Sequence, residues 1–199
     1  MRLLAFSDLH RDLEQAARLV DLSADVDVVI GAGDFASVHE GLDEEIAALS
    51  AIEKPTVLVP GNNETLEALR EAAEAWPAAT VLHGDSAEIE GRLFYGLGAG
   101  VPTTPWSWSY DLDESEAERA LAGLPDGAIL VVHSPPKGHC DEAGNGMHLG
   151  SAAILDAIER TEPELAVCGH IHESWGKTST VGPTEICNLG PEGKIFELD

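Results

Sequence analysis

The sequence is poor in positive charge. It has 11 lysine and arginine residues against 36 acidic ones, which gives a formal net charge of −25 at pH 7, and only four of the basic residues are lysines. A surface with this balance repels phosphate backbones and anionic lipid headgroups, which argues against stable binding to nucleic acid or to a membrane. Because salt screens self-repulsion, a halophilic source and an ordinary acidic protein are both open explanations.

Cysteines are few and long apolar runs are missing. Cys140, Cys168 and Cys187 form no CxxC pair and are odd in number, which predicts reduced thiols rather than a disulfide framework or a zinc knuckle. No apolar stretch is long enough to cross a bilayer, and the first residues begin a strand pattern rather than a signal peptide. We therefore expect a cytoplasmic protein.

Short apolar runs alternate with helical patterns along most of the chain. Buried strands are predicted over 2–7, 26–31, 56–60, 128–132 and 164–168. Helices are predicted over 11–23, 39–52, 64–75, 113–122 and 151–161. This alternation is typical of parallel strands joined by crossover helices.

Two segments depart from this alternation. The short strand-like runs after residue 79 predict an antiparallel set, and the segment 173–198 predicts another β meander. Residues 134–150 are too rich in proline and glycine for regular structure and predict a functional loop. No linker interrupts the chain, so we expect one domain, 1–199. Its expected fold class is α/β, a four-layer αββα sandwich in which two mixed β-sheets pack together with helices outside.

Five of the predicted strands end at residues that can bind metal. These residues are Asp8, His10, Asp34, Asn62, His133, His170 and His172. Ligands of open α/β sheets sit at the carboxyl ends of the strands, so side chains that are distant in sequence can converge there. Carboxylate, amide and imidazole ligands suit Mn²⁺, Fe or Zn²⁺ rather than Ca²⁺.

In order and spacing these residues resemble the signature of the calcineurin-like metallophosphoesterase superfamily. The matching segments are Asp8-Leu9-His10, Gly33-Asp34, Gly61-Asn62-Asn63-Glu64, His133 and Gly169-His170-Ile171-His172. The resemblance implies that Asp8, His10 and His172 hold one divalent metal ion. It implies that Asn62, His133 and His170 hold a second, with Asp34 bridging the two. Manganese is the preferred metal, and iron, zinc, nickel and cobalt are alternatives.

The resemblance also implies a phosphohydrolase. Two cations about 3.5–4 Å apart can share a water, lower its pKa and stabilise both oxygens of an in-line displacement. We expect a small phosphoester as substrate, a phosphodiester in preference to a monoester, attacked by a hydroxide that bridges the metals. A phosphomonoesterase or protein phosphatase using the same site, and a non-catalytic scaffold like the retromer subunit, are the alternatives. The oligomeric state is not predicted.

Two residues outside the ligand set are expected to contact the phosphate. Many family members have histidine where this chain has Asn63, and asparagine can donate a hydrogen bond but cannot act as a general acid near neutral pH. His148 belongs to an H-x-P-P … G-x-H-x-G pattern that resembles the branch of 239AB-type phosphodiesterases. Contact with the phosphate and structuring of the loop are both open roles for His148.

The sequence gives weaker evidence for a functional role of the remaining aromatic and histidine residues. Trp106, Trp108 and Tyr110 lie in a turn-rich stretch. They could stack on a nucleobase or line a leaving-group pocket, but covering a sheet edge is the preferred interpretation. His39 and His139 are expected to be surface residues.

Overall fold

The computed structural model describes residues 1–199, and its first sheet is formed mainly by the apolar runs of the N-terminal half. Five strands form it in the order β11-β1-β2-β3-β4. Their bounds are β1 Arg2–Phe6, β2 Val28–Gly31, β3 Thr56–Leu58, β4 Ala79–Val81 and β11 Lys194–Glu197. Strands β1 to β4 are parallel, and β11 is antiparallel to β1.

The second sheet has six strands in the order β5-β6-β7-β8-β10-β9. Their bounds are β5 Asp85–Ile89, β6 Arg92–Leu97, β7 Ile129–Val132, β8 Leu165–Cys168, β9 Thr178–Val181 and β10 Thr184–Asn188. Strands β6, β7, β8 and β10 run parallel, and the edge strands β5 and β9 are antiparallel to their neighbours.

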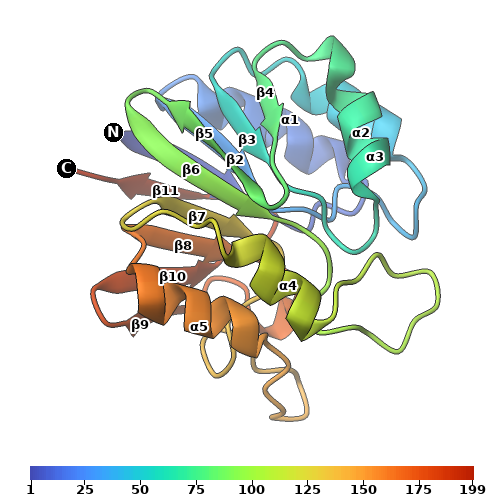
Figure 1. Cartoon of the computed structure of the whole chain (residues 1–199). Coiled ribbons are helices and arrows are strands. Elements are labelled where there is room, and N and C mark those ends of the chain that lie inside the picture. Colours follow the sequence, from blue (N-terminus) through green and yellow to red (C-terminus); the bar gives the residue numbers. More distant parts are fainter.

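Helices cover the outer face of each sheet (Figure 1). On the first sheet these are α1 (Leu13–Ser23), α2 (Leu42–Leu49) and α3 (Leu66–Ala72), the last followed by the 3₁₀ turn η1 (Ala73–Ala75). On the second sheet they are α4 (Glu114–Leu121) and α5 (Ala152–Thr161). A further 3₁₀ turn, η2 (His172–Ser174), follows β8. No helix has the length and apolar character needed to span a membrane.

Side-chain alternation along the central strands explains why they are buried throughout. In β1, Leu3 and Ala5 face the second sheet, whereas Leu4 and Phe6 pack against the helices of the first sheet. Phe94 and Val131 of the second sheet pack with these residues in the core between the two sheets. The predicted α/β sandwich of two mixed sheets with helices outside is therefore confirmed.

Two expectations about the strands were wrong. Strand β4 pairs parallel with β3 and closes the first sheet, so only β5 and β6 form an antiparallel pair in that region. The segment 173–198 is not one meander, because β11 leaves the β9–β10 hairpin and pairs with β1 in the other sheet. Phe196 explains this path, since its ring is buried in the core between the sheets.

The helix predicted over 39–52 is shorter than expected. It begins at Leu42, after Gly41, whose φ of 75° lies in the left-handed region. A residue in the left-handed region cannot continue an α-helix toward its N-terminus, so the helix starts after Gly41. The position also requires glycine, because a Cβ added there would lie 2.2 Å from Nε of Arg11. Residues 34–40 therefore remain a loop at the end of β2.

Glu45 in α2 gives a prediction for stability against pH. Its side chain is 0% exposed and neither carboxylate oxygen has a hydrogen-bond partner. Burial, with a contribution from Asp12, raises the pKa of Glu45 from 4.5 to about 7. Folding therefore favours the protonated form of Glu45. The stabilisation from this protonated form is complete below pH 4.5 and is lost as the pH rises through about 7, where Glu45 ionises in the folded protein.

We therefore expect Glu45→Gln to stabilise the protein at pH 8 by about 2–3 kcal/mol and to change little at pH 4.5. Denaturant titrations at the two pH values measure the difference. The matched control is Glu44→Gln, which alters an exposed neighbour in the same helix turn. An equal effect of Glu45→Gln at both pH values would contradict the raised pKa of Glu45.

Candidate metal centre

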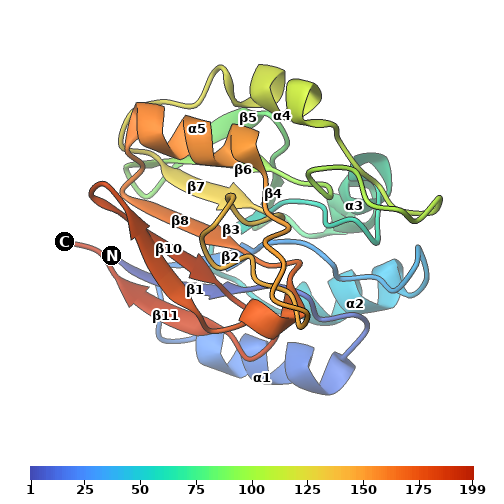
Figure 2. The same ribbon diagram turned by 90° about the horizontal axis from the view of Figure 1, so that it is seen from below.

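The residues that we expect to bind metal lie in the loops that follow the parallel strands. Asp8 follows β1, Asp34 follows β2, and Asn62 follows β3. His133 comes directly after β7, and His170 follows β8. These ends lie at one edge of the sandwich, opposite the two chain termini (Figure 2). The structure thus brings together all seven positions that the sequence singled out as ligands.

Several of these residues have unusual backbone conformations. Asp8, His10, Asp34 and His170 have φ values of 57°, 49°, 58° and 69°, a region that residues other than glycine rarely occupy. Such strain is concentrated at functional sites and persists only where the surroundings impose it. Gly33 shows how closely the loops approach, because a Cβ there would lie 2.5 Å from the backbone nitrogen of Gly61.

The first cluster consists of Asp8, His10 and His172, whose ligand atoms all lie within 4.8 Å of one another. The Nε2 atoms of His10 and His172 are 3.2 Å apart, and Nε2 of His172 is 3.7 Å from Oδ1 of Asp8. Nδ1 of His10 lies 3.1 Å from the carbonyl oxygen of Ala36. Because a carbonyl oxygen only accepts, Nδ1 carries a proton, and in the neutral ring Nε2 then has the lone pair that faces the cluster.

The second cluster consists of Asp34, His133 and His170, again within 4.8 Å. Nδ1 of His133 donates to the carbonyl oxygen of Ala32 at 2.8 Å, so in the neutral ring Nε2 carries the lone pair. That Nε2 lies 3.5 Å from Oδ1 of Asp34 and 3.2 Å from Oδ1 of Asn62. Asn62 Oδ1 is also 3.0 Å from Nδ1 of His170.

Asp34 lies between the two clusters. Its Oδ2 is 3.6 Å from Nε2 of His10, and its Oδ1 is 3.5 Å from Nε2 of His133. Nε2 of each histidine thus points toward carboxylate or amide oxygens of the site. Electron-rich atoms converge in this way around a cation. The donor set of nitrogen and oxygen fits divalent transition metals, with Asp34 placed to contact one on each side.

Burial controls the protonation of the centre. Burial and the charge of Asp8 raise the pKa of Asp34 to about 7. Burial lowers the pKa of His170 to about 3, so this ring is neutral and able to ligate. Burial opposes ionisation of Asp8, but the contact with His172 and the hydrogen bond from Ser7 outweigh it and lower the pKa of Asp8 to about 2.

Glu64 organises two of the ligand loops, a role that the sequence did not predict. Its Oε1 accepts hydrogen bonds from the backbone N–H groups of Asp34 at 2.9 Å and Gly61 at 2.6 Å. Its Oε2 accepts from the N–H of Ala36 at 3.1 Å. Burial and the charge of Asp34 raise the pKa of Glu64 to about 7. The carboxylate of Glu64 thereby joins the loop after β2 to the loop after β3.

Asn63 is turned toward Asp34. Its backbone N–H donates to Oδ1 of Asp34 at 2.9 Å and its Nδ2 donates to Oδ2 at 2.7 Å. The amide oxygen of Asn63 accepts from the N–H of Val38 at 2.8 Å. Asn63 also lines the cavity described below, so its contact with phosphate stays a prediction.

His148 is held by the loop that contains it. Nδ1 of His148 lies 2.6 Å from Oδ1 of the buried Asp141, and the side chain is 52% exposed. Asp141 in turn accepts from the N–H groups of Gly138 and Gly150. These contacts fit the loop-structuring role, and His148 is not among the residues lining the cavity over the clusters. Contact of His148 with phosphate stays a prediction.

A cavity of about 550 Å³ opens over the two clusters. Its floor includes His10, Asp34 and Asn62, and its walls include Trp106 and Trp108. Trp106 and Trp108 therefore line the cavity instead of covering a sheet edge, whereas Tyr110 is not among the lining residues. A volume of this size is in the range of small-molecule sites.

The fold and the site define a class, the two-sheet α/β proteins with paired metal-ligand clusters at the strand ends. Comparison with known families identifies the group. Residues 1–195 match the calcineurin-like phosphoesterase superfamily domain, and the chain belongs to this family.

Individual relatives agree with this membership. A UPF0046 protein of Caenorhabditis elegans is 29% identical over 199 residues, covering 81% of this chain and 50% of the relative. The chain thus spans half the length of that relative. An uncharacterized protein of Methanocaldococcus jannaschii is 28% identical over 202 residues, covering 96% of this chain and 89% of the relative.

A solved structure shows the same fold. A crystal structure of a Thermus thermophilus protein aligns with a TM-score of 0.76 at 19% identity, covering 96% of this chain and 90% of that one. The family is one of metallophosphoesterases, and the two clusters of this chain are its candidate metal sites.

Proposed function

We propose that this protein is a phosphodiesterase that uses two divalent metal ions and acts on small phosphoesters. The observation that carries the proposal is the position of Asp34, within 3.6 Å of a lone-pair nitrogen in each cluster. The proposed ligands of the first metal are Asp8, His10, His172 and Asp34. The proposed ligands of the second are Asp34, Asn62, His133 and His170. A chain that had become a scaffold would have no reason to keep both sets complete.

Manganese is the metal that we propose, because the sites combine imidazole with hard oxygen ligands. A pair of such ions supplies an activated water and neutralises charge on the phosphoryl oxygens. The chain's own residues fix the geometry. Asn63 holds both oxygens of Asp34 through its N–H donors, and Glu64 holds the backbone around it. Neither Asn63 donor is acidic enough to protonate a leaving group near neutral pH.

The charges around the cavity favour a diester over a monoester. No lysine or arginine lines the cavity, and the acidic residues that do are Asp34 and Glu173. A phosphomonoester carries nearly two negative charges near neutral pH, whereas a diester carries one. Without a basic side chain, the second charge of a monoester would face an acidic surface.

The test is metal loading followed by a substrate panel. We expect the Mn²⁺-loaded protein to hydrolyse bis(p-nitrophenyl) phosphate with a higher kcat/KM than p-nitrophenyl phosphate. Chelation should remove the activity, and added Mn²⁺ should restore it. Faster turnover of the monoester would favour the phosphomonoesterase alternative. A protein loaded with two metals that hydrolyses neither compound would refute the proposed function.

A further inference from the structure

Two tryptophans form a flat surface beside the metal centre. The indole rings of Trp106 and Trp108 are stacked, with centroids 5.6 Å apart and planes at 11°. Trp106 is 51% exposed, and both rings line the cavity that contains His10 and Asp34. Exposed indole is costly to hydrate, so a stacked pair at the mouth of a site indicates a surface for a ligand.

Hydrogen bonds hold this surface in place relative to the metal ligands. Nε2 of His39 donates to the carbonyl oxygen of Trp108 at 2.6 Å. Nδ2 of Asn62 donates to Oγ of Ser109 at 2.8 Å, and the carbonyl oxygen of Asn62 accepts from the N–H of Tyr110. Asn62 thus contributes its amide oxygen to the second cluster and its amide nitrogen to the aromatic loop.

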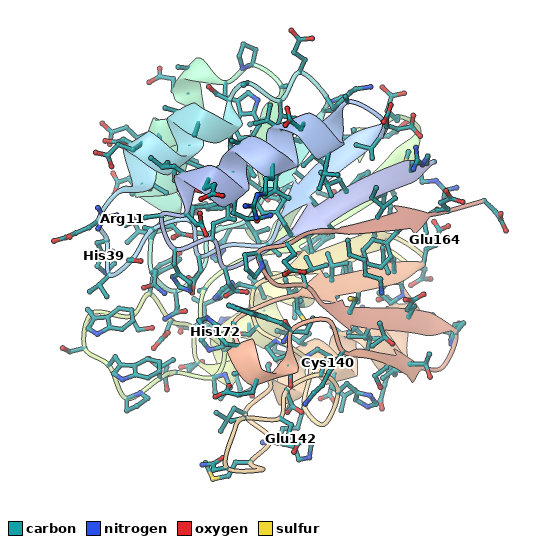
Figure 3. All side chains as sticks on the ribbon, turned by 180° about the vertical axis from the view of Figure 1, so that it is seen from behind. Arg11, His39, Cys140, Glu142, Glu164 and His172 are labelled. Carbon is teal, nitrogen blue, oxygen red and sulfur yellow. The ribbon has the colours of Figure 1, made fainter.

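The loop is also braced internally. Oγ of Ser109 donates to Oδ1 of Asp111 at 2.6 Å, and Oδ2 of Asp111 accepts from the N–H of Thr104 at 2.7 Å. In Figure 3 the labelled His39 lies next to the loop of residues 102–110, and His172 faces it from the other side. A surface fixed in this way recognises a ligand without an ordering cost, which favours binding.

The electrostatics of the cavity limit what can stack there. No lysine or arginine lines it and Glu173 lies on its wall, so negative charge is compensated only at the metal centre with its histidines. A group that carries further phosphates or carboxylates would meet no counter-charge. A flat, uncharged ring can stack on the outer face of an indole of this pair and loses little hydration.

We propose that Trp106 and Trp108 select phosphodiesters in which one ester group is an uncharged planar aromatic ring, held by stacking. This inference rests on the proposed function, because the phosphoryl group must lie on the metal centre for the ring to reach the indoles. Trp106 and Trp108 are then specificity-determining residues.

Binding of two monoanionic diester analogues tests the proposal. The affinities of methyl phenylphosphonate and methyl methylphosphonate for the Mn²⁺-loaded protein are measured by calorimetry. We expect the phenyl compound to bind about tenfold more tightly, as is typical of ring stacking on aromatic side chains. Trp106→Phe should keep most of this preference. Trp106→Ala and Trp106→Leu should lose it, because leucine supplies apolar area but no flat face.

Controls separate this inference from the proposed function. Leu93→Ala removes an exposed apolar side chain from β6, away from the cavity, and should leave the preference unchanged. Metal content and turnover of bis(p-nitrophenyl) phosphate are measured for every variant. A phenyl preference that survives in Trp106→Ala or Trp106→Leu, or that is missing from the wild type, overturns the stacking proposal even if hydrolysis is intact. A protein that binds two metals and prefers the phenyl compound but hydrolyses nothing overturns the proposed function alone.

Discussion

Asp34→Asn is expected to lower kcat/KM on phosphodiesters by roughly 10³-fold, because one substitution weakens both proposed metal sites. The carboxylate oxygens of Asp34 face His10 at 3.6 Å and His133 at 3.5 Å. An amide presents one weaker oxygen ligand and one N–H₂ group, so only one of the two sites keeps an oxygen. The amide nitrogen would also meet the donating groups of Asn63.

The measurement combines kinetics with metal content for each variant. Asp34→Asn should retain fewer than two metals per chain, and its loss of activity should not follow from unfolding. Burial raises the pKa of Asp34 to about 7, so the charge destabilises the metal-free fold above that pH. Removing the charge offsets the hydrogen bond lost from Asn63, so the metal-free variant should be about as stable as the wild type at pH 8.

The control for Asp34→Asn is Asp113→Asn, the same chemical change at an exposed helix cap. Asp113 is the N-cap of α4, and its side chain accepts from the N–H of Glu116, a role that asparagine also fills. Activity and metal content should be unchanged in this control. Wild-type turnover with two bound metals in Asp34→Asn would show that the bridging assignment is wrong.

Glu64→Ala is expected to cause the largest loss of stability, about 3–5 kcal/mol, because three buried N–H donors lose their acceptor. The donors are the backbone groups of Asp34, Ala36 and Gly61. Since Asp34 and Asn62 lie on these loops, metal affinity should fall together with stability.

Denaturant titrations of Glu64→Ala with and without Mn²⁺ measure both effects. The matched control is Glu67→Ala, which removes an exposed carboxylate in the first turn of α3. Glu64→Gln should be intermediate, because its amide oxygen can still accept from two donors while its nitrogen faces the third. Equal stability of Glu64→Ala and Glu67→Ala would contradict the assigned role.

The convergence of the metal-ligand positions could be predicted because it depends on two simple rules. Parallel strands place their carboxyl ends at one edge, and each of the relevant strands is a short apolar run that ends in a ligand type. Asp8 and His133 are 125 positions apart in the sequence, yet both follow central strands. The pairing of β11 with β1 could not be predicted, because local alternation does not specify which sheet a strand joins.

The supporting residues were not predictable for a different reason. Glu64 was visible within its motif, but its partners are backbone N–H groups whose directions depend on loop conformations with positive φ, as at Asp34. The path of the loop that carries Trp106 and Trp108 depends on hydrogen bonds from Asn62 and His39, two residues far away in sequence. Hydrophobic periodicity carries no information about such contacts.

The central claim is that two metal ions share Asp34, and anomalous diffraction from crystals grown with Mn²⁺ tests it most directly. Two anomalous peaks are expected in each molecule. One should lie among Asp8, His10, His172 and Asp34, and the other among Asp34, Asn62, His133 and His170. A single peak in the site, or two peaks of which only one contacts Asp34, would contradict the account.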